Sequence, residues 1–150
     1  MPHTYTYLAL HIVFGTKERA PLITAEIRDD LFAYMSGIVR ETGCKTVIIN
    51  GMPDHVHLLT SMSPTVAVAD MMRVLKTNAS RWVHEKWPAR HTFGWQEGYG
   101  AFSVSRSAMA DVESYIANQE EHHRKVSFEE EYIMLLKRHD LYDEGRYFSR

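Results

Sequence analysis

The sequence contains a single cysteine, Cys44, among its 150 residues, so no disulfide can form within the chain. A reduced, cytoplasmic setting is the simplest expectation. No apolar run approaches the roughly 18 residues needed to cross a bilayer. The first residues also lack the basic segment and apolar core of a signal peptide. We therefore expect a cytoplasmic protein without a membrane anchor.

An excess of positive charge is also missing. The chain has 17 lysines and arginines against 19 aspartates and glutamates, a formal net charge of −2. Such a protein has no overall attraction to polyanions, so any nucleic-acid surface must be a local patch. Low-complexity tracts, repeats and linkers are absent as well, and the length suits one buried core. We expect a single domain over residues 1–150.

The hydrophobic pattern switches between strand-like and helix-like segments. β-branched and aromatic residues predict strands at 5–14, 45–50 and 55–62, and one or two short strands within 93–105. Apolar residues at helical spacing, with Thr24, Ser107 and Ser127 as N-caps, predict helices at about 25–42, 66–87, 108–124 and 127–138. This order predicts an α+β fold of ferredoxin-like type, in which helices pack on one face of an antiparallel sheet.

Two histidines, His55 and His57, alternate with apolar residues on the strand predicted at 55–62. Side chains alternate along a strand, so both imidazoles project from one face about 7 Å apart and can converge on one divalent ion. Two hydrogen-bonded histidines at a sheet surface would give the same pattern. Nine histidines in 150 residues also make a chance pair common.

The residues after this pair argue against other His-x-His sites. A histidine-triad hydrolase needs a third histidine at position 59, which is leucine here, and residues 58–63 offer no glutamate for a cupin site. The chain is also much too short for an amidohydrolase barrel. Any third ligand must come from elsewhere in the chain.

The helix predicted at 108–124 can complete such a site. Tyr115 and Gln119 are four residues apart, so they share a helix face beside the apolar seam of Val112 and Ile116. A carbonyl oxygen together with two imidazoles favours Mg²⁺ or Mn²⁺ over Zn²⁺. Spacing alone does not single out one of the eight tyrosines, and a tyrosine packed at the helix edge would look the same.

We expect no ligand role for the other histidines and acidic residues of this region. Adjacent residues on a helix point about 100° apart, which argues against His122 and His123 as a metal pair. The remaining carboxylates are expected on solvated faces: Glu120, Glu121 and Glu129 to Glu131.

Positive charge is concentrated in residues 73–90, where five basic residues accompany one glutamate. Arg73, Lys76 and Arg81 are the candidate phosphate contacts. Lys17 and Arg19, in the turn after the first strand, are weaker candidates. A solvated charged face is the alternative interpretation of the whole stretch. Trp82 and Trp87 could stack on bases, although Trp82 lies on the apolar face, which favours core packing.

Several separate segments together resemble one family, the small single-tyrosine HUH (His-hydrophobe-His) transposases, which mobilise insertion sequences of the 200/605 group as single strands. The resemblance runs in order along most of the chain. It covers Tyr7 to Lys17, Gly51 to Leu59, Leu75-Lys76 with Ser80 to Trp82, Gly98 to Ser105, Tyr115 to His123 and Ser127-Phe128. The tail, Tyr142 to Arg150, differs from the usual ending, which leaves its docking open.

The resemblance implies that Tyr115 is the nucleophile and that His55, His57 and Gln119 bind the metal. It implies a metal-dependent transposase that nicks and rejoins single-stranded DNA through a 5′-phosphotyrosine. It also implies recognition of DNA hairpins at insertion-sequence ends, and a nucleoid-associated homodimer in which the tyrosine helix of one subunit can serve the metal site of the other. A domesticated DNA-nicking relative and a non-catalytic hairpin-binding module are the alternatives.

Overall fold

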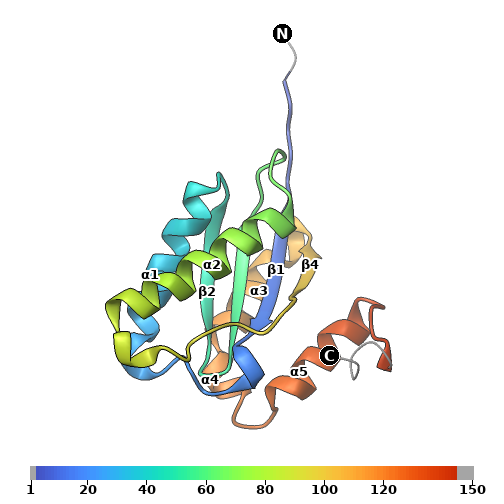
Figure 1. Cartoon of the computed structure of the whole chain (residues 1–150). Helices are drawn as coiled ribbons and strands as arrows, with labels where there is room; N and C mark the ends of the chain where they lie inside the picture. Colours follow the sequence, from blue (N-terminus) through green and yellow to red (C-terminus); the bar gives the residue numbers. More distant parts are fainter. Residues whose placement is uncertain (1–2, 145–150) are drawn as a thin grey trace.

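The computed structural model describes residues 3–144 (Figure 1). The elements in chain order are β1 (Ala9–Gly15), α1 (Ala25–Glu41), β2 (Lys45–Met52), β3 (His55–Ser61), α2 (Val68–Lys86), β4 (Gly100–Val104), α3 (Met109–Ala117), α4 (Gln119–His122) and α5 (Phe128–Arg138). Short 3-10 turns lie at Lys17–Arg19, Pro88–Arg90 and Arg106–Ala108. Residues 145–150 of the divergent tail lie outside the described residues.

The four strands form one antiparallel sheet in the order β2-β3-β1-β4. Strand β1 lies between β3 and β4, and the register sets Val13 beside His57 and Gly15 beside His55. Helices α1 and α2 each connect two strands across the sheet, as in a βαββαβ unit. The predicted α+β, ferredoxin-like antiparallel sheet is confirmed.

The main hydrophobic core lies between the sheet and helices α1 and α2, which cover the same face (Figure 1). Strand residues of one parity, such as Ile12, Phe14, Val56 and Leu58, enter this core. They meet the apolar seams of the two helices, formed by Ile27, Leu31, Met35, Ile38, Met71, Leu75 and Ala79. Trp82 packs against the edge of this core, as expected.

The opposite face of the sheet is covered by the C-terminal helices, so the expected packing on one face holds only for α1 and α2. Ile116 of α3 packs against Ala9, Leu59 and Val104, and α5 packs on Phe102 through Phe128 and Leu135. The sheet buries apolar residues of both parities, and each apolar face has to be covered. Space between the sheet and these C-terminal helices holds the candidate site.

The extents of β1 and of the helix predicted at 108–124 differ most from the prediction, whereas the one or two short strands predicted within 93–105 are confirmed as one, β4. Strand β1 begins at Ala9 rather than residue 5, because Ala9 already pairs with Ser61 and Val104, where β3 and β4 end. The helix predicted at 108–124 is interrupted at Asn118. Of the three predicted caps, Ser127 forms a full capping box with Glu130, whereas the Thr24 side chain makes no capping bond and Ser107 lies in the turn before α3.

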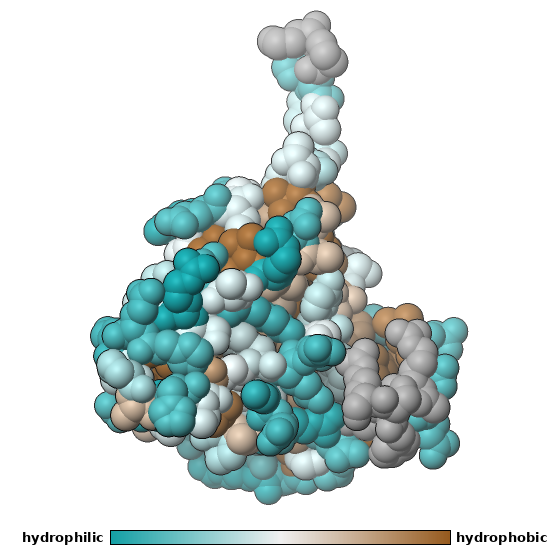
Figure 2. Space-filling view, viewed as in Figure 1, coloured by the Kyte–Doolittle hydropathy of each residue, from teal (hydrophilic) through white to brown (hydrophobic). Residues whose placement is uncertain are grey.

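Residues 3–8 extend away from the body as an arm, with Tyr5 88% exposed (Figure 1). Figure 2 shows a mostly hydrophilic surface over the face that α1 and α2 form, and a hydrophobic area where the arm meets the body. Within residues 3–144, none of the helices has the length and apolar content that a bilayer crossing requires.

The central packing of β3 predicts a large stability cost for truncating Leu58. Its side chain is fully buried between the sheet and α1/α2, so Leu58→Ala should lower the free energy of unfolding by about 2–5 kcal/mol. Leu141→Ala is the matched control, because Leu141 is 55% exposed. Urea denaturation measures both variants, and equal losses would contradict this account of the core.

Candidate metal and nucleophile site

Strand β3 presents His55 and His57 on the face turned away from the main core. Both side chains are fully buried, and their ring centroids are 5.1 Å apart. Phe128, the first residue of α5, stacks on the His55 ring at 4.0 Å between centroids. Gly15 leaves room for this contact, since a β-carbon there would come within 3.1 Å of the Phe128 ring. The lack of a side chain at this position of β1 thus allows α5 to pack over the histidines.

The interruption at Asn118 sets the positions of Tyr115 and Gln119. Asn118 has φ −100° and ψ 27°, which are not helical values. Asn50, on the same sheet face as His57, donates its amide to the carbonyls of Ile116 at 2.9 Å and Ala117 at 3.4 Å. The Asn118 amide donates to the Ser114 carbonyl at 2.8 Å. Side chains therefore satisfy carbonyls that the end of α3 leaves free.

The four predicted site residues come together within one chain. Gln119 is fully buried, and its Oε1 lies 3.3 Å from His55 Nε2. The His57 and Tyr115 rings are 5.9 Å apart between centroids. The hydroxyl of Tyr115 donates to Glu131, whose other carboxylate oxygen lies 2.9 Å from His57 Nε2. A phenol, two imidazoles and an amide oxygen thus share one small volume.

Two residues for which the sequence predicted no ligand role also belong to this cluster. Glu131, expected on a solvated face, is only 1% exposed. His123, expected to have no ligand role, places Nε2 3.0 Å from both Gln119 Oε1 and Glu131 Oε1. The cause is the interruption at Asn118 and the end of α4 at His122, because the 100° step assumed one regular helix through residue 124. His122 points the same way, with Nε2 3.4 Å from the Tyr115 hydroxyl.

A sequence signal for Glu131 was present. Phe128, Glu131 and Leu135 are spaced three and four residues apart, so they form the buried seam of α5. A carboxylate at a seam position is unusual, because an ionised side chain is rarely buried without a partner. His123 had no comparable signal, since its direction depends on the turn between α4 and α5.

Each of the three imidazoles is held from outside at Nδ1 and points Nε2 inward. His55 Nδ1 donates to Asp54 at 2.7 Å, and His123 Nδ1 donates to the Val126 carbonyl at 2.7 Å. His57 Nδ1 lies 2.7 Å from His11 Nε2. Asp54 and the Val126 carbonyl accept hydrogen bonds here, so they select the tautomer that leaves an Nε2 lone pair for a ligand.

The charges in the site shift several pKa values. Burial alone would raise the pKa of Glu131, but hydrogen bonds from His123, His55 and His57 outweigh it and hold the pKa far below its usual range. Burial, reinforced by the Glu131 carboxylate, raises the pKa of Tyr115 well above 10. The phenol is therefore protonated at rest. Burial lowers the pKa of His57, whereas hydrogen bonds to Asp54 and Glu131 outweigh burial and raise that of His55.

The donor atoms fit a divalent ion. His55, His57, His123 and Glu131 each offer one ligand atom, and these atoms all lie within 4.8 Å of one another. Neighbouring ligands of an octahedral ion with bonds of about 2.1 Å lie about 3.0 Å apart. The distances from Glu131 Oε1 to the Nε2 atoms of His57, His123 and His55 are 2.9, 3.0 and 3.2 Å. The set contains no thiolate, and imidazole nitrogens and a carboxylate oxygen are donors that divalent ions take in proteins.

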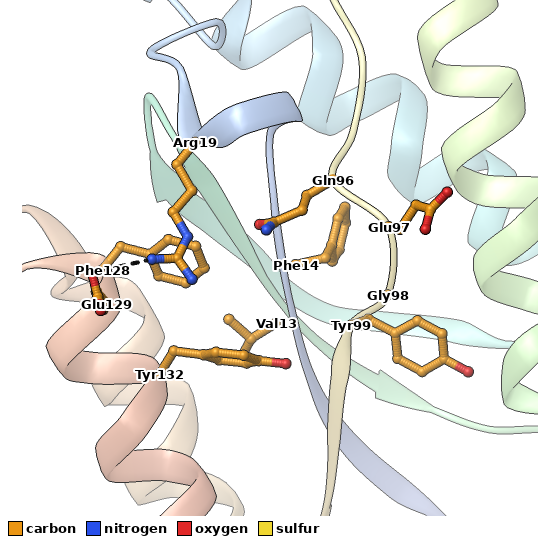
Figure 3. A pocket seen from close by; sticks show the side chains of 10 residues that line it. All are labelled: Val13, Phe14, Arg19, Gln96, Glu97, Gly98, Tyr99, Phe128, Glu129 and Tyr132. Carbon is orange, nitrogen blue, oxygen red and sulfur yellow. Dashed lines mark ion pairs between the residues drawn. The ribbon is translucent and has the colours of Figure 1, made fainter. Parts of the chain in front are cut away.

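Three cavities adjoin the cluster. One of about 390 Å³ is lined by Asp54 and His123, and the other two lie along α5. The smaller of these two, of about 240 Å³, lies between α5 and the segment 96–99 (Figure 3). The ring of its lining residue Phe128 stacks on His55. In Figure 3 the Arg19 side chain reaches across this cavity toward Glu129, to which it is paired at 3.5 Å. The other, of about 520 Å³, is lined by Tyr115 and His11 from one side and by Arg138 and His139 of the α5 end.

The predicted basic contacts divide between the two sides of the sheet. Arg19 lies beside the site, with its guanidinium 5.5 Å from the Phe128 ring centroid, and Lys17 is in the same exposed turn. Arg73, Lys76 and Arg81 are on α2, which covers the opposite face. The Lys76 ammonium donates to the carbonyls of Gln96 and Gly98 and so holds the segment 96–98. Phosphate contacts by these five residues stay a prediction.

His11 gives the site a testable pH dependence. Burial, and then the neighbouring His57, lower the pKa of His11 from 6.5 to about 3. Between these pH values the unfolded chain binds a proton that the folded chain does not. The contribution of His11 to the free energy of unfolding is therefore fully present above pH 6.5 and is lost as the pH falls. Glutamine in place of His11 keeps an amide that can hydrogen-bond to His57, but it cannot bind a proton in this pH range. The wild type should lose up to about 1.4 kcal/mol per pH unit more than His11→Gln below pH 6.5.

Urea denaturation from pH 7.5 to 5 measures this difference, because the other titrating groups are common to both proteins. His3→Gln, in the exposed arm, is the control and should follow the wild type. Parallel profiles for wild type and His11→Gln would contradict the assignment.

Comparisons with known proteins point to one family. The family model described as "Transposase IS200 like" matches residues 4–119. The ISDra2 transposase TnpA of Deinococcus radiodurans is 30% identical over 121 residues, which cover 77% of this chain and 86% of that protein. The transposase for insertion sequence element IS200 of Salmonella typhimurium is 25% identical over 124 residues, covering 79% and 81%.

Two solved structures are similar in fold. A transposase from Deinococcus radiodurans R1 has a TM-score of 0.62 and 27% identity, covering 79% of this chain and 96% of that one. The REP-associated tyrosine transposase bound to a REP hairpin has a TM-score of 0.61 and covers 84% and 76%, and at 13% identity it supports the fold alone. The family model spans most of the chain and includes His55, His57, Tyr115 and Gln119. The chain belongs to the IS200-like transposase family.

Proposed function

We propose that this transposase nicks and rejoins single-stranded DNA through a covalent bond between Tyr115 and a 5′ phosphate. One observation carries the proposal: within a single chain, the Tyr115 hydroxyl lies in the same buried cluster as His55, His57 and Gln119. A protein that only binds hairpins has no physical need for a phenol beside a set of metal ligands. Assembly within one chain also requires no residue from a partner subunit.

The chemistry starts with the Tyr115 oxygen attacking the scissile phosphorus. The new bond joins this oxygen to phosphorus, and the bond from phosphorus to the 3′ oxygen breaks. The phenol proton passes to an oxygen of the attacked phosphate and from there to the 3′ oxygen, which leaves as a hydroxyl. Glu131 holds the phenol by a hydrogen bond, but its low pKa makes it a poor proton acceptor. A 3′ hydroxyl of another strand can reverse the step, because one phosphodiester has been exchanged for another.

His55, His57 and Gln119 are the proposed ligands of Mg²⁺ or Mn²⁺. When bound, a divalent ion offsets the charge on the phosphate and polarises its bonds. The protein's own contribution is to fix the ligand orientations, through Asp54 behind His55 and His11 behind His57.

Single-stranded DNA would reach Tyr115 through the larger cavity, whose lining includes this residue and Arg138. The smaller cavity, with Arg19 over the Phe128 ring, could hold a neighbouring nucleotide by stacking and charge. The REP-associated relative was solved with a hairpin, and we propose that this chain also binds hairpin ends, as a homodimer on nucleoid DNA in the cytoplasm. Arg73, Lys76, Arg81, Lys17 and Arg19 are its further proposed contacts.

The nucleophile is tested with labelled single-stranded DNA that carries candidate hairpins, in the presence of Mn²⁺. The wild type should form a covalent adduct that survives denaturing electrophoresis and that EDTA prevents. Tyr115→Phe should reduce the adduct at least 1000-fold, because the attacking oxygen is lost. Tyr34→Phe is the matched control, since Tyr34 stacks on Trp82 on the other side of the sheet. An adduct on Tyr115→Phe would refute the assignment, and cleavage without any adduct would indicate a hydrolase.

The proposed DNA path is tested at Arg138. Arg138→Gln should weaken single-strand binding at low salt and reduce the slope of log affinity against log salt by about 1. Arg124→Gln is the control, because Arg124 pairs with Glu121 and lines none of the three cavities. Fluorescence anisotropy over a salt series measures both. Identical slopes for Arg138→Gln and wild type would exclude this path.

A further inference from the structure

We infer that the segment after the family match adds two ligands, His123 and Glu131, so that the metal site has five protein donors, and that Glu131 also ties the Tyr115 hydroxyl to that site. The inference rests on the proposed function and extends it. The family model ends at Gln119, whereas both added residues come from the turn after α4 and from α5. Glu131 is thus a metal ligand through Oε1 and a positioning residue for Tyr115 through Oε2.

The first support is the direction of the lone pairs. The outer hydrogen bonds of His55 and His123 leave an unprotonated Nε2 in the neutral imidazole. Both Nε2 atoms face the same carboxylate oxygen, at 3.2 and 3.0 Å. In the neutral form these lone pairs would repel the anionic oxygen, so the arrangement needs positive charge, either as protons on the Nε2 atoms or as a cation bound among them. A cation at the centre is attracted by all of these donors at once.

The second support is the burial of Glu131. At 1% exposure, an ionised carboxylate needs compensation that water cannot provide. Within the described part of the chain, its two oxygens contact imidazoles, the Gln119 amide and the Tyr115 hydroxyl. None of these carries a permanent positive charge. A divalent ion provides the charge and keeps the donor positions as they are.

The third support is that the local fold fixes both added donors. Ser127 and Glu130 form a capping box that starts α5 at a defined residue. Phe128 then anchors the first turn by stacking on His55, and Glu131 follows three residues later on the same helix face. His123 is held at Nδ1 by the Val126 carbonyl of the same turn. A ligand set needs this kind of preorganisation.

Binding of Mn²⁺ to the DNA-free protein tests the inference without any activity readout. Titration followed by the electron paramagnetic resonance of free Mn²⁺ should show that Glu131→Gln binds at least tenfold more weakly than wild type. Glu129→Gln, which removes a half-exposed carboxylate from the same helix turn, should bind within twofold of wild type. Equal affinities for wild type and Glu131→Gln would overturn the role of Glu131.

His123→Asn separates the ligand role from the structural role, because the asparagine amide can still donate to the Val126 carbonyl. Electron spin-echo measurements on bound Mn²⁺ should detect three coordinated imidazole nitrogens in wild type and two in His123→Asn. His122→Asn should keep three. Two nitrogens in wild type would overturn the role of His123, and this readout holds even where Glu131→Gln fails to fold.

The adduct assay separates this inference from the proposed function. If wild type binds Mn²⁺ and forms the Tyr115 adduct while both variants keep full Mn²⁺ affinity, only the added ligands are refuted. A wild type that neither binds Mn²⁺ nor forms the adduct refutes both. Tighter Mn²⁺ binding or more adduct in Glu131→Gln would show that the carboxylate blocks the site, which also overturns the inference.

Discussion

The two-residue period of β3 is the constraint on which the rest of the structure depends. Val56 and Leu58 enter the core under α1 and α2, so His55 and His57 must emerge on the opposite face. A shift of one residue in the register would bury the imidazoles among apolar side chains and expose the core. The pairing that stabilises the fold therefore also aims the two ligands, and the C-terminal helices need only close over that face.

The interruption of the helical segment at Asn118 completes the site whose first two ligands the sheet provides. Because the helix is interrupted at Asn118, Gln119 and His123 approach the histidines while Tyr115 stays on α3. The Asn50 amide, donating from β2 to the end of α3, couples this interruption to the strand beside His57. The nucleophile and the ligands are thus held in fixed positions relative to the same sheet. A phenol that must attack a phosphorus at a fixed angle requires such a rigid frame.

The fold could be predicted because it follows from periodicity, whereas the choice of Tyr115 and Gln119 came from the family resemblance, since spacing does not single out one of the eight tyrosines. Alternation fixed the direction of His55 and His57, whereas the break at Asn118, which the regular helical spacing did not predict, sets the positions of Tyr115 and Gln119. The burial of Glu131 was missed although its spacing with Phe128 and Leu135 places it on the seam of α5. The direction of His123 depends on a break and a turn, which spacing rules do not describe. The extent of β1 was also missed, since the end of a strand is set by where its neighbours end. The covering of the second face depends on tertiary packing, which the pattern of a single segment does not reveal.

Closing the site matters for the outcome of the proposed chemistry. His55, His57, Gln119 and Glu131 are all at most 1% exposed, and the Phe128 ring stacks on His55. If an activated water attacked the phosphotyrosine, the link would be hydrolysed and the energy of the phosphodiester would be lost. Excluding water lets the intermediate persist until a 3′ hydroxyl arrives. On this view α5 has a chemical purpose beyond covering an apolar face: it favours strand joining over hydrolysis.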